Sequence, residues 1–175
     1  MGANPSAFKG PKNPVENVSW DDCREFLKKL NGLGKDPGQF RLPTDAEWEW
    51  ACRAGTRTRF SFGDEESALA DYGWFDGNSG KTTHPVGAKK PNAWGLYDCH
   101  GNVGEWCGDW YEDYSRGWWP KADPTGPKTG GFRVLRGGSW SDNAWHCQSA
   151  PRRSIPVARP DNDGLRVVGS SSRTP

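Results

Sequence analysis

The sequence predicts a single, loop-rich α+β domain, and three observations support this fold class. Two short helical patterns with strong capping residues lie in the first third of the chain, and short β-rich segments lie near Phe40 and in the last quarter. The 23 glycines and 14 prolines leave most of the rest to turns and irregular loops. Only 33% of the residues are hydrophobic, but 11 tryptophans, 7 phenylalanines and 4 tyrosines indicate order, because disordered chains are poor in aromatic residues.

The first helix is predicted to begin after Ser19. Ser19 is a good N-cap residue, and Asp22 stands three residues later as a short form of the capping box. An apolar stripe at positions i, i+3, i+4 and i+7 predicts one buried face, made of Cys23, Phe26, Leu27 and Leu30. Gly32 and Gly34 are expected to end this helix.

A short strand at Phe40–Leu42 is predicted to lead into the second helix. Thr44 and Glu47 form a second capping box, and the apolar face of this helix is Trp48, Ala51 and Cys52. Gly55 is expected to end the helix, and the following residues 56–92 show no helical period. We expect one domain over residues 1–168, followed by a tail of residues 169–175.

The last quarter of the chain places a long irregular segment between two predicted strands. Phe132–Leu135 and Leu165–Val168 are β-rich and alternate in polarity, whereas residues 141–163 have no sustained period of 2 or 3.6. Long irregular segments held on a rigid scaffold are where binding and catalysis usually occur. Gly137 and Gly138 at its start permit positive φ or a close backbone approach.

Charge and cysteine usage exclude several classes of function. The formal net charge is +1, and the charges are interspersed without a basic stripe, so we expect no nucleic-acid partner. No apolar run approaches the length of a membrane span, and the start of the chain shows no signal peptide. Five cysteines without a Cys-x-x-Cys spacing disfavour a zinc site and a complete disulfide framework. A reducing compartment is the simpler expectation, with the cytoplasm, export and display on a virion all left open.

Six motifs, in this order along the chain, resemble the formylglycine-generating-enzyme-like (sulfatase-modifying factor) domain. They are PVENVSW at 14–20, RLPTDAEWE at 41–49, NAWGLYD at 92–98, GNVGEW at 101–106, RGGSW at 136–140 and GLRVV at 164–168. The resemblance covers nearly the whole chain. It implies a C-type-lectin-like fold with few helices, short twisted antiparallel strands and much irregular loop.

The enzymes of this family bind copper through two cysteines in the loop after the Gly-Gly-Ser motif. The matching positions here are Asp142 and Cys147, so the cysteine pair is incomplete. Because Cu(I) selects soft sulfur ligands, usually more than one, we expect no copper and no formylglycine-generating activity. Cys147 is then a buried structural thiol or a disulfide partner of Cys107.

Another group of proteins with this fold matches the C-terminal segment better than the copper enzymes do. Residues 139–168 resemble the variable region of diversity-generating-retroelement variable proteins, which display diversified side chains as a ligand-binding surface. Residues of the family pattern alternate here with positions of unrelated residue type. These variable-type positions are Ser141, Asp142, Trp145, His146, Gln148, Pro151, Arg153, Ser154, Ile155, Val157, Ala158, Pro160, Asp161 and Asn162.

The composition of these positions suits a contact surface. Trp145 and His146 offer rigid amphipathic area, and Arg153 offers a forked hydrogen-bond donor, as in paratopes and interface hot spots. We therefore expect a non-enzymatic protein whose partner is an unidentified protein or glycan, such as one on a cell surface. The alternatives are a fixed binding or structural module, and a metal-dependent oxidase or sulfoxide-forming enzyme of the same family. His84, His100 and His146 show no metal-ligand spacing.

The resemblance also implies a calcium site. The family's calcium loop matches Asp98, Gly101, Val103 and Glu105, which would supply side-chain and main-chain oxygens. Gly104 stands where an aromatic residue is usual. The alternative is that the two carboxylates are salt-bridged or hydrogen-bonded without an ion.

Overall fold

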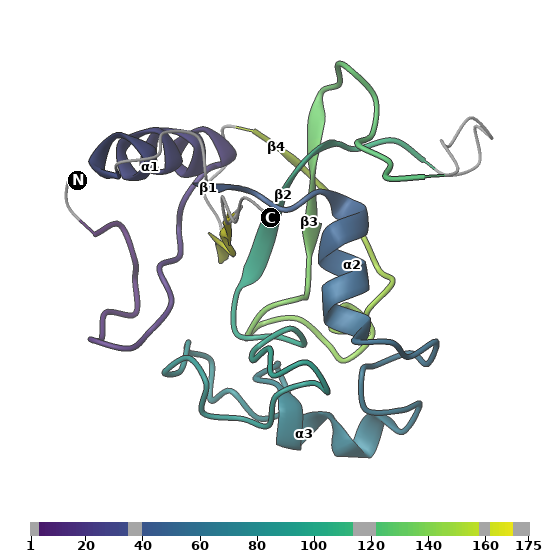
Figure 1. The fold of residues 1–175 in the computed structure, drawn as a ribbon. Helices are drawn as coiled ribbons and strands as arrows, with labels where there is room; N and C mark the ends of the chain where they lie inside the picture. The colour runs from purple at the N-terminus through teal and green to yellow at the C-terminus, as the bar shows by residue number, and fades with distance from the viewer. Residues whose placement is uncertain (1–3, 35–39, 114–121, 158–161, 170–175) are drawn as a thin grey trace.

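The computed structural model describes residues 4–34, 40–113, 122–157 and 162–169, and it confirms the α+β class (Figure 1). The helices are α1 (Trp20–Leu33), α2 (Asp45–Arg53), the 3-10 turn η1 (Glu66–Ala68) and α3 (Leu69–Tyr72). The strands are β1 (Phe40–Arg41), β2 (Gly104–Trp110), β3 (Phe132–Arg136), β4 (Arg153–Pro156), β5 (Asp163–Leu165) and β6 (Val168–Gly169). Within these ranges, no helix is long and apolar enough to cross a membrane.

A four-stranded sheet in the order β4-β3-β2-β5 forms the centre of the molecule. β3 pairs antiparallel with both β2 and β4, whereas β5 pairs parallel with β2. The expectation of antiparallel strands alone is therefore wrong at β5, which lies at the opposite edge from β4 and runs in the same direction as β2. β1 and β6 form a separate antiparallel pair, in which Gly169 lies opposite Phe40, so strand pairing extends one residue into the expected tail.

Three local expectations need correction. The stretch 56–92 contains the short helix α3. The predicted strand Leu165–Val168 is divided, because its first residue ends β5 and its last begins β6. The predicted irregular segment 141–163 contains β4, which forms through its pairing with β3 and not through local alternation.

Both capping boxes form as predicted. Ser19 Oγ accepts from the Asp22 amide at 3.1 Å, and Asp22 Oδ2 accepts from the Ser19 amide at 3.0 Å. Thr44 Oγ1 accepts from the Glu47 amide at 3.1 Å, and Glu47 Oε2 accepts from the Thr44 amide at 2.8 Å. These bonds satisfy free amides of the first turn and fix where each chain enters its helix.

The core consists of three clusters that together position the C-terminal segment. The first joins α1 to the sheet through Trp20, Cys23, Leu27, Trp106 and Leu135. The second lies between α2 and the sheet and contains Trp48, Cys52, Cys99, Cys107 and Val134. The third contains Phe60, Leu69, Ala144 and Cys147. The third cluster therefore holds the loop after β3 against the loops around α3, at the end of the sheet away from α1 (Figure 1).

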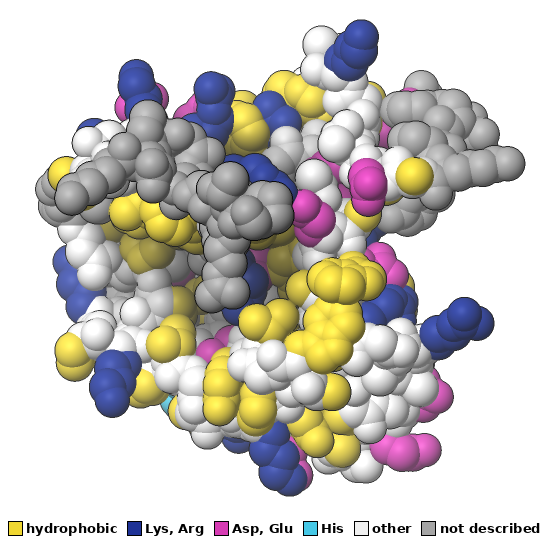
Figure 2. Space-filling view, viewed as in Figure 1, with side chains coloured by type: hydrophobic (Ala, Val, Ile, Leu, Met, Phe, Trp, Pro, Cys, Tyr) yellow, Lys and Arg dark blue, Asp and Glu magenta, His cyan; other side chains and the backbone are white. Residues whose placement is uncertain are grey.

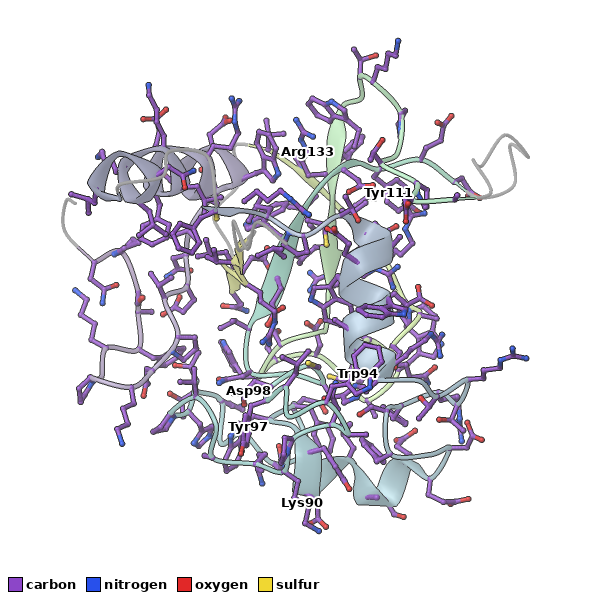
Figure 3. The ribbon with its side chains drawn as sticks, viewed as in Figure 1. Lys90, Trp94, Tyr97, Asp98, Tyr111 and Arg133 are labelled. Carbon is purple, nitrogen blue, oxygen red and sulfur yellow. The ribbon has the colours of Figure 1, made fainter. Side chains whose placement is uncertain are left out.

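A buried arginine adds to the first cluster. Arg133 on β3 lies between the rings of Trp20 and Trp110, with its guanidinium carbon 3.6 and 3.4 Å from the two ring centroids. Its Nη1 donates to the Gly108 carbonyl at 2.7 Å. Figure 3 labels this side chain at the α1 end of the sheet. Burial lowers the pKa of Arg133 to about 10, so the side chain stays charged near pH 7.

Candidate functional site

The segment after β3 is anchored from beneath by Arg136. The side chain of Arg136 is fully buried, and its Nη1 donates to the carbonyls of Ser149 at 3.0 Å and Ala150 at 2.7 Å. Its Nε and Nη2 bind the carboxylates of Asp45 and Glu49 on α2. One guanidinium thus ties the irregular loop to a helix, and its buried charge is balanced by two carboxylates.

Gly137 and Gly138 turn the chain at this point with φ values of 91° and 68°. A Cβ on Gly138 would lie 2.7 Å from Cys147 Sγ, so this position requires glycine both for its φ and for its contact. Cys147 is fully buried, and burial raises the pKa of its thiol. All five cysteines are free, so of the two alternatives for Cys147 the buried thiol is confirmed and the disulfide with Cys107 is wrong.

Asp142, which stands where the family enzymes have their first copper cysteine, lies in an ion pair. Its Oδ2 accepts from the Ser139 hydroxyl at 2.7 Å and from Arg153 Nη1 at 3.0 Å. A second bond, from Asn162 Nδ2 to Ser141 Oγ at 3.0 Å, joins the end of the segment to its beginning. Residues that are 11 and 21 positions apart in the sequence are therefore held together.

The exposed part of the segment centres on Trp145. This side chain is 57% exposed, and its ring meets the His146 ring edge to face, with centroids 5.0 Å apart. Among the other variable-type positions, Ser141 and Ser154 are exposed, and eight are half-buried. The half-buried ones are Asp142, His146, Gln148, Pro151, Arg153, Ile155, Val157 and Asn162.

Two of the half-buried positions contact the core, and three predicted positions lie outside the described residues. Ile155 on β4 and Val157 just after this strand are apolar and pack against the first core cluster. Ala158, Pro160 and Asp161 fall in the range 158–161, which is not described. The variable-type set thus divides into a solvent-facing group and an inward-facing pair.

Sequence reasoning missed Asn143, which shapes the exposed tip. Its Oδ1 accepts from the amide of Trp145 at 3.1 Å and lies 3.1 Å from His146 Nδ1. An Asn side chain that binds the backbone two residues on is an Asx-turn, and this bond holds the Trp145 backbone in place. The available signal was an asparagine two residues before an exposed aromatic residue.

His100 supports the same segment from below. Its Nε2 accepts from the Ser61 amide at 3.2 Å, and its Nδ1 lies 2.8 Å from the Cys147 carbonyl, which can only accept. Burial lowers the pKa of His100 to about 4, so the ring is neutral near pH 7 with its proton on Nδ1. His100 is thus a structural side chain with both ring nitrogens engaged.

The predicted calcium residues line one cavity of about 370 Å³ at the lower end of β2. The cavity is lined by Asp98, Gly101, Val103 and Glu105 among others, and Figure 3 labels Asp98 there. Asp98 Oδ2 accepts from the Gly87 amide at 2.8 Å, whereas its Oδ1 is buried without a hydrogen-bond partner. Burial raises the pKa of Asp98. A hard cation fits this unsatisfied oxygen.

Glu105 fits such a cation less well. Arg166 binds both of its carboxylate oxygens, at 2.6 and 2.8 Å, and Trp48 Nε1 donates to Oε2 at 2.6 Å. A cation would have to share Glu105 with Arg166. No three His, Cys, Asp or Glu side chains among the described residues are placed to hold a metal ion, so an ion here would depend on main-chain oxygens.

A further surface lies outside every predicted site. Figure 2 shows hydrophobic side chains gathered over α2 and the loop below it, and the exposed rings there include Trp50 and Trp94, whose centroids are 4.3 Å apart. Trp50 also borders a cavity of about 1100 Å³, together with Trp20 and Leu27 of α1. Neither ring belongs to the variable-type set.

Comparison with known proteins places the chain in a family. The family described as "Sulfatase-modifying factor enzyme 1-like domain" matches residues 1–171. The formylglycine-generating enzyme of Streptomyces coelicolor is 35% identical over 191 residues, which cover 99% of this chain and 58% of that enzyme. The chain thus spans little more than half the length of this relative.

Two solved structures are similar over nearly the whole chain. Treponema denticola variable protein 1 has a TM-score of 0.83 and 34% identity, covering 96% of this chain and 75% of the other. PvdO from Pseudomonas aeruginosa has a TM-score of 0.82 and 29% identity, covering 93% of this chain and 64% of the other. The chain therefore belongs to the sulfatase-modifying factor (formylglycine-generating-enzyme-like) family and has its C-type-lectin-like fold.

Proposed function

We propose that this chain is a non-enzymatic ligand-binding protein that displays its variable-type positions as a diversified surface. The observation that carries the proposal is a rigidly held segment with an exposed aromatic tip. Arg136 and the Asp142–Arg153 pair hold the segment, and Trp145 projects from it. Similarity to a solved variable protein, at 34% identity, supports the same function.

The anchoring favours binding because it reduces the conformational entropy that the loop loses when it binds a partner. A loop that is already ordered loses less conformational freedom when it meets a partner, so a small contact area suffices for affinity. Trp145 supplies a rigid ring, and Ser141 and Ser154 supply short hydroxyls that adapt to different partners. A protein or a glycan fits this mixture of one large ring and small polar groups.

The chemistry of the loop argues against copper. Cys147 is a single buried thiol with a raised pKa, and Asp142, at the position of the family's first copper cysteine, is a carboxylate held by Arg153. Cu(I) binds thiolates, usually more than one, so these residues do not fit the ion. No reaction step through copper follows from this site.

We propose calcium as a ligand of the Asp98 loop. Asp98 Oδ1 and the carbonyls of Gly101 and Val103 would hold the ion, with Glu105 shared between the ion and Arg166. When bound, the ion would supply structural stabilisation and no catalysis. The unsatisfied oxygen of Asp98 supports this proposal.

A second candidate is a metal-dependent oxidase or sulfoxide-forming enzyme. Identity of 35% with a formylglycine-generating enzyme across 99% of the chain favours it. The two candidates differ in metal content. The enzyme would take up Cu(I) or iron stoichiometrically and lose the metal in the Cys147→Ser variant, whereas the binding protein would take up neither.

A display screen tests the proposed function directly. The purified chain is panned against a cell-surface protein library and a glycan array, and each binder is retested with Trp145→Ala. We expect that substitution to weaken binding at least about tenfold, as for an interface hot spot. Trp50→Ala is the matched control, because Trp50 is 68% exposed and lies outside the segment. Binding that survives Trp145→Ala but is lost in Trp50→Ala would place the binding surface elsewhere.

A further inference from the structure

Two cysteines from distant parts of the sequence share the wall of one small cavity. The cavity measures about 230 Å³ and lies between α2, Pro43 and Val168. Cys52 near the end of α2 and Cys99 in the loop before β2 both line it. The other three thiols do not border this cavity, so the pair is set apart by position.

The Cys52 side chain lies against the main chain of Cys99. Cys52 Sγ lies 3.8 Å from the Cys99 carbonyl oxygen, and both residues belong to the second core cluster. Burial raises the pKa of the Cys52 thiol. Cys99 is 4% exposed and Cys52 is fully buried, so a small molecule in the cavity would meet Cys99 first.

The other polar neighbours of Cys52 do not compete with Cys99 for a covalent bond. Its sulfur lies 3.5 Å from Ser149 Oγ and 3.9 Å from His100 Nε2, which are polar neighbours that cannot form a covalent bond to it. Cys23 lies in the first core cluster and Cys147 in the third, whereas Cys107 shares the second cluster but does not line the cavity. Cys99 is thus the thiol with which Cys52 is expected to pair.

We propose that Cys52 and Cys99 are a peroxide-sensitive dithiol that closes to a reversible disulfide. Hydrogen peroxide oxidises the Cys99 sulfur to a sulfenic acid and leaves as one water molecule. The Cys52 sulfur then attacks the sulfenic sulfur, forms the S–S bond and releases the second water molecule. Two thiols and one peroxide thus give one disulfide and two waters, and a dithiol reductant reverses the reaction.

The bond would join α2 to the loop that carries Asp98 and Gly101. Closing it restricts the unfolded chain across the sequence between residues 52 and 99, so the oxidised protein should melt at a higher temperature than the reduced protein. Formation of the Cys52–Cys99 disulfide would therefore increase the order of the Asp98 loop under oxidising conditions.

Peroxide titration of the whole chain, followed by non-reducing peptide mapping, tests the proposal. We expect two of the five thiols to be lost, a single 52–99 cross-linked peptide to appear, and dithiothreitol to restore both thiols. Cys52→Ser should convert the product into a sulfenic or more oxidised Cys99 without a cross-link. Cys23→Ser is the matched control, since Cys23 is also buried and lies in another cluster, and it should form the 52–99 cross-link as the parent does.

If a variant fails to fold, measurements on the parent protein alone still decide the test. A cross-link that involves Cys107 in place of either residue, or oxidation of Cys99 to sulfinic acid with Cys52 still reduced, would overturn the proposal. So would five thiols that stay reduced at peroxide concentrations that oxidise free cysteine.

Discussion

Two loops of this molecule are expected to bind a ligand, and they differ in how their buried polar groups are hydrogen-bonded. In the loop of residues 141–151, main-chain carbonyls meet Arg136, and the Asp142 carboxylate is held by Ser139 and Arg153. In the loop of residues 94–105, the buried Asp98 Oδ1 has no hydrogen-bond partner. These polar groups of the first loop have hydrogen-bond partners within the protein, whereas the second loop contains a buried oxygen without one.

This difference separates two kinds of site. A loop whose polar groups are satisfied internally holds its shape, so its exposed side chains can be exchanged without loss of the fold. A loop with an unsatisfied buried carboxylate oxygen becomes more stable when a cation supplies the missing contact. Four substitutions, in order of expected effect, would break or sharpen this contrast.

Arg136→Ala should have the largest effect on stability. The substitution removes one of the positive charges that balance the Asp45 carboxylate, and it removes the donor to the carbonyls of residues 149–151. Breaking a buried ion pair costs about 3–5 kcal/mol. Urea unfolding of both proteins measures the loss. Arg153→Ala is the control, because the side chain of Arg153 is 29% exposed and its single pair should contribute about 1 kcal/mol or less. Equal losses in the two variants would refute the anchoring role of Arg136.

Gly138→Ala should follow, with a loss of about 2–4 kcal/mol from its positive φ and the clash with Cys147. Gly131→Ala is the matched control, since a Cβ there meets no atom within 4 Å. Thermal unfolding compares the two. A small loss at both positions would mean that the turn after β3 is not fixed by its backbone conformation.

Asp98→Asn probes the second loop through its charge. Burial raises the pKa of Asp98 in the folded state, so stability falls as the pH rises from the ordinary carboxyl pKa through the raised folded-state pKa. Without calcium, the variant should therefore gain stability over the parent at pH 7 to 8 and lose this advantage in acid. Melting temperatures across this pH range measure the difference, and an advantage that grows in acid would contradict the sign.

Calcium should reverse the order of the two proteins. Ligand at about 100 times its dissociation constant stabilises the parent by about 2.7 kcal/mol, whereas the variant lacks the charged ligand and should respond less. Magnesium at the same ionic strength is the control for non-specific salt effects. If neither calcium nor a chelator changed the melting temperature of the parent protein, no ion would occupy this loop.

Trp145→Ala should have the smallest effect on stability, within about 0.5 kcal/mol, because the side chain is 57% exposed. Differential scanning calorimetry measures it. Ile155→Ala, at a position that packs against the core, should cost about 1–3 kcal/mol and serves as the contrasting member of the same set. Equal costs at the two positions would contradict the division of the set into solvent-facing and inward-facing groups.

Local chemistry predicted the helices and the position of the loop. Ser19 and Thr44 begin helices because a single side chain and an amide three residues on are sufficient for a cap. Gly137 and Gly138 marked the turn into the loop, since few other residues adopt positive φ there.

Long-range pairing explains what the sequence did not reveal. β2 is an inner strand of the sheet, yet two glycines interrupt its pattern and its first four residues are all buried, so no alternation marks it. Gly104 is needed because a Cβ there would lie 2.6 Å from Asp163 Oδ1 on the neighbouring strand. The inward orientation of Ile155 likewise depends on β3, a partner about 20 residues earlier in the chain.

Sequencing the 3′ end of the gene across many cells of the source population tests the central claim most directly. We predict substitutions concentrated at the solvent-facing variable-type positions, such as Trp145, His146 and Ser154, with Arg136, Gly138 and Gly164 unchanged. Substitutions spread evenly over the gene, or confined to residues outside 141–162, would contradict a diversified binding surface on this fold.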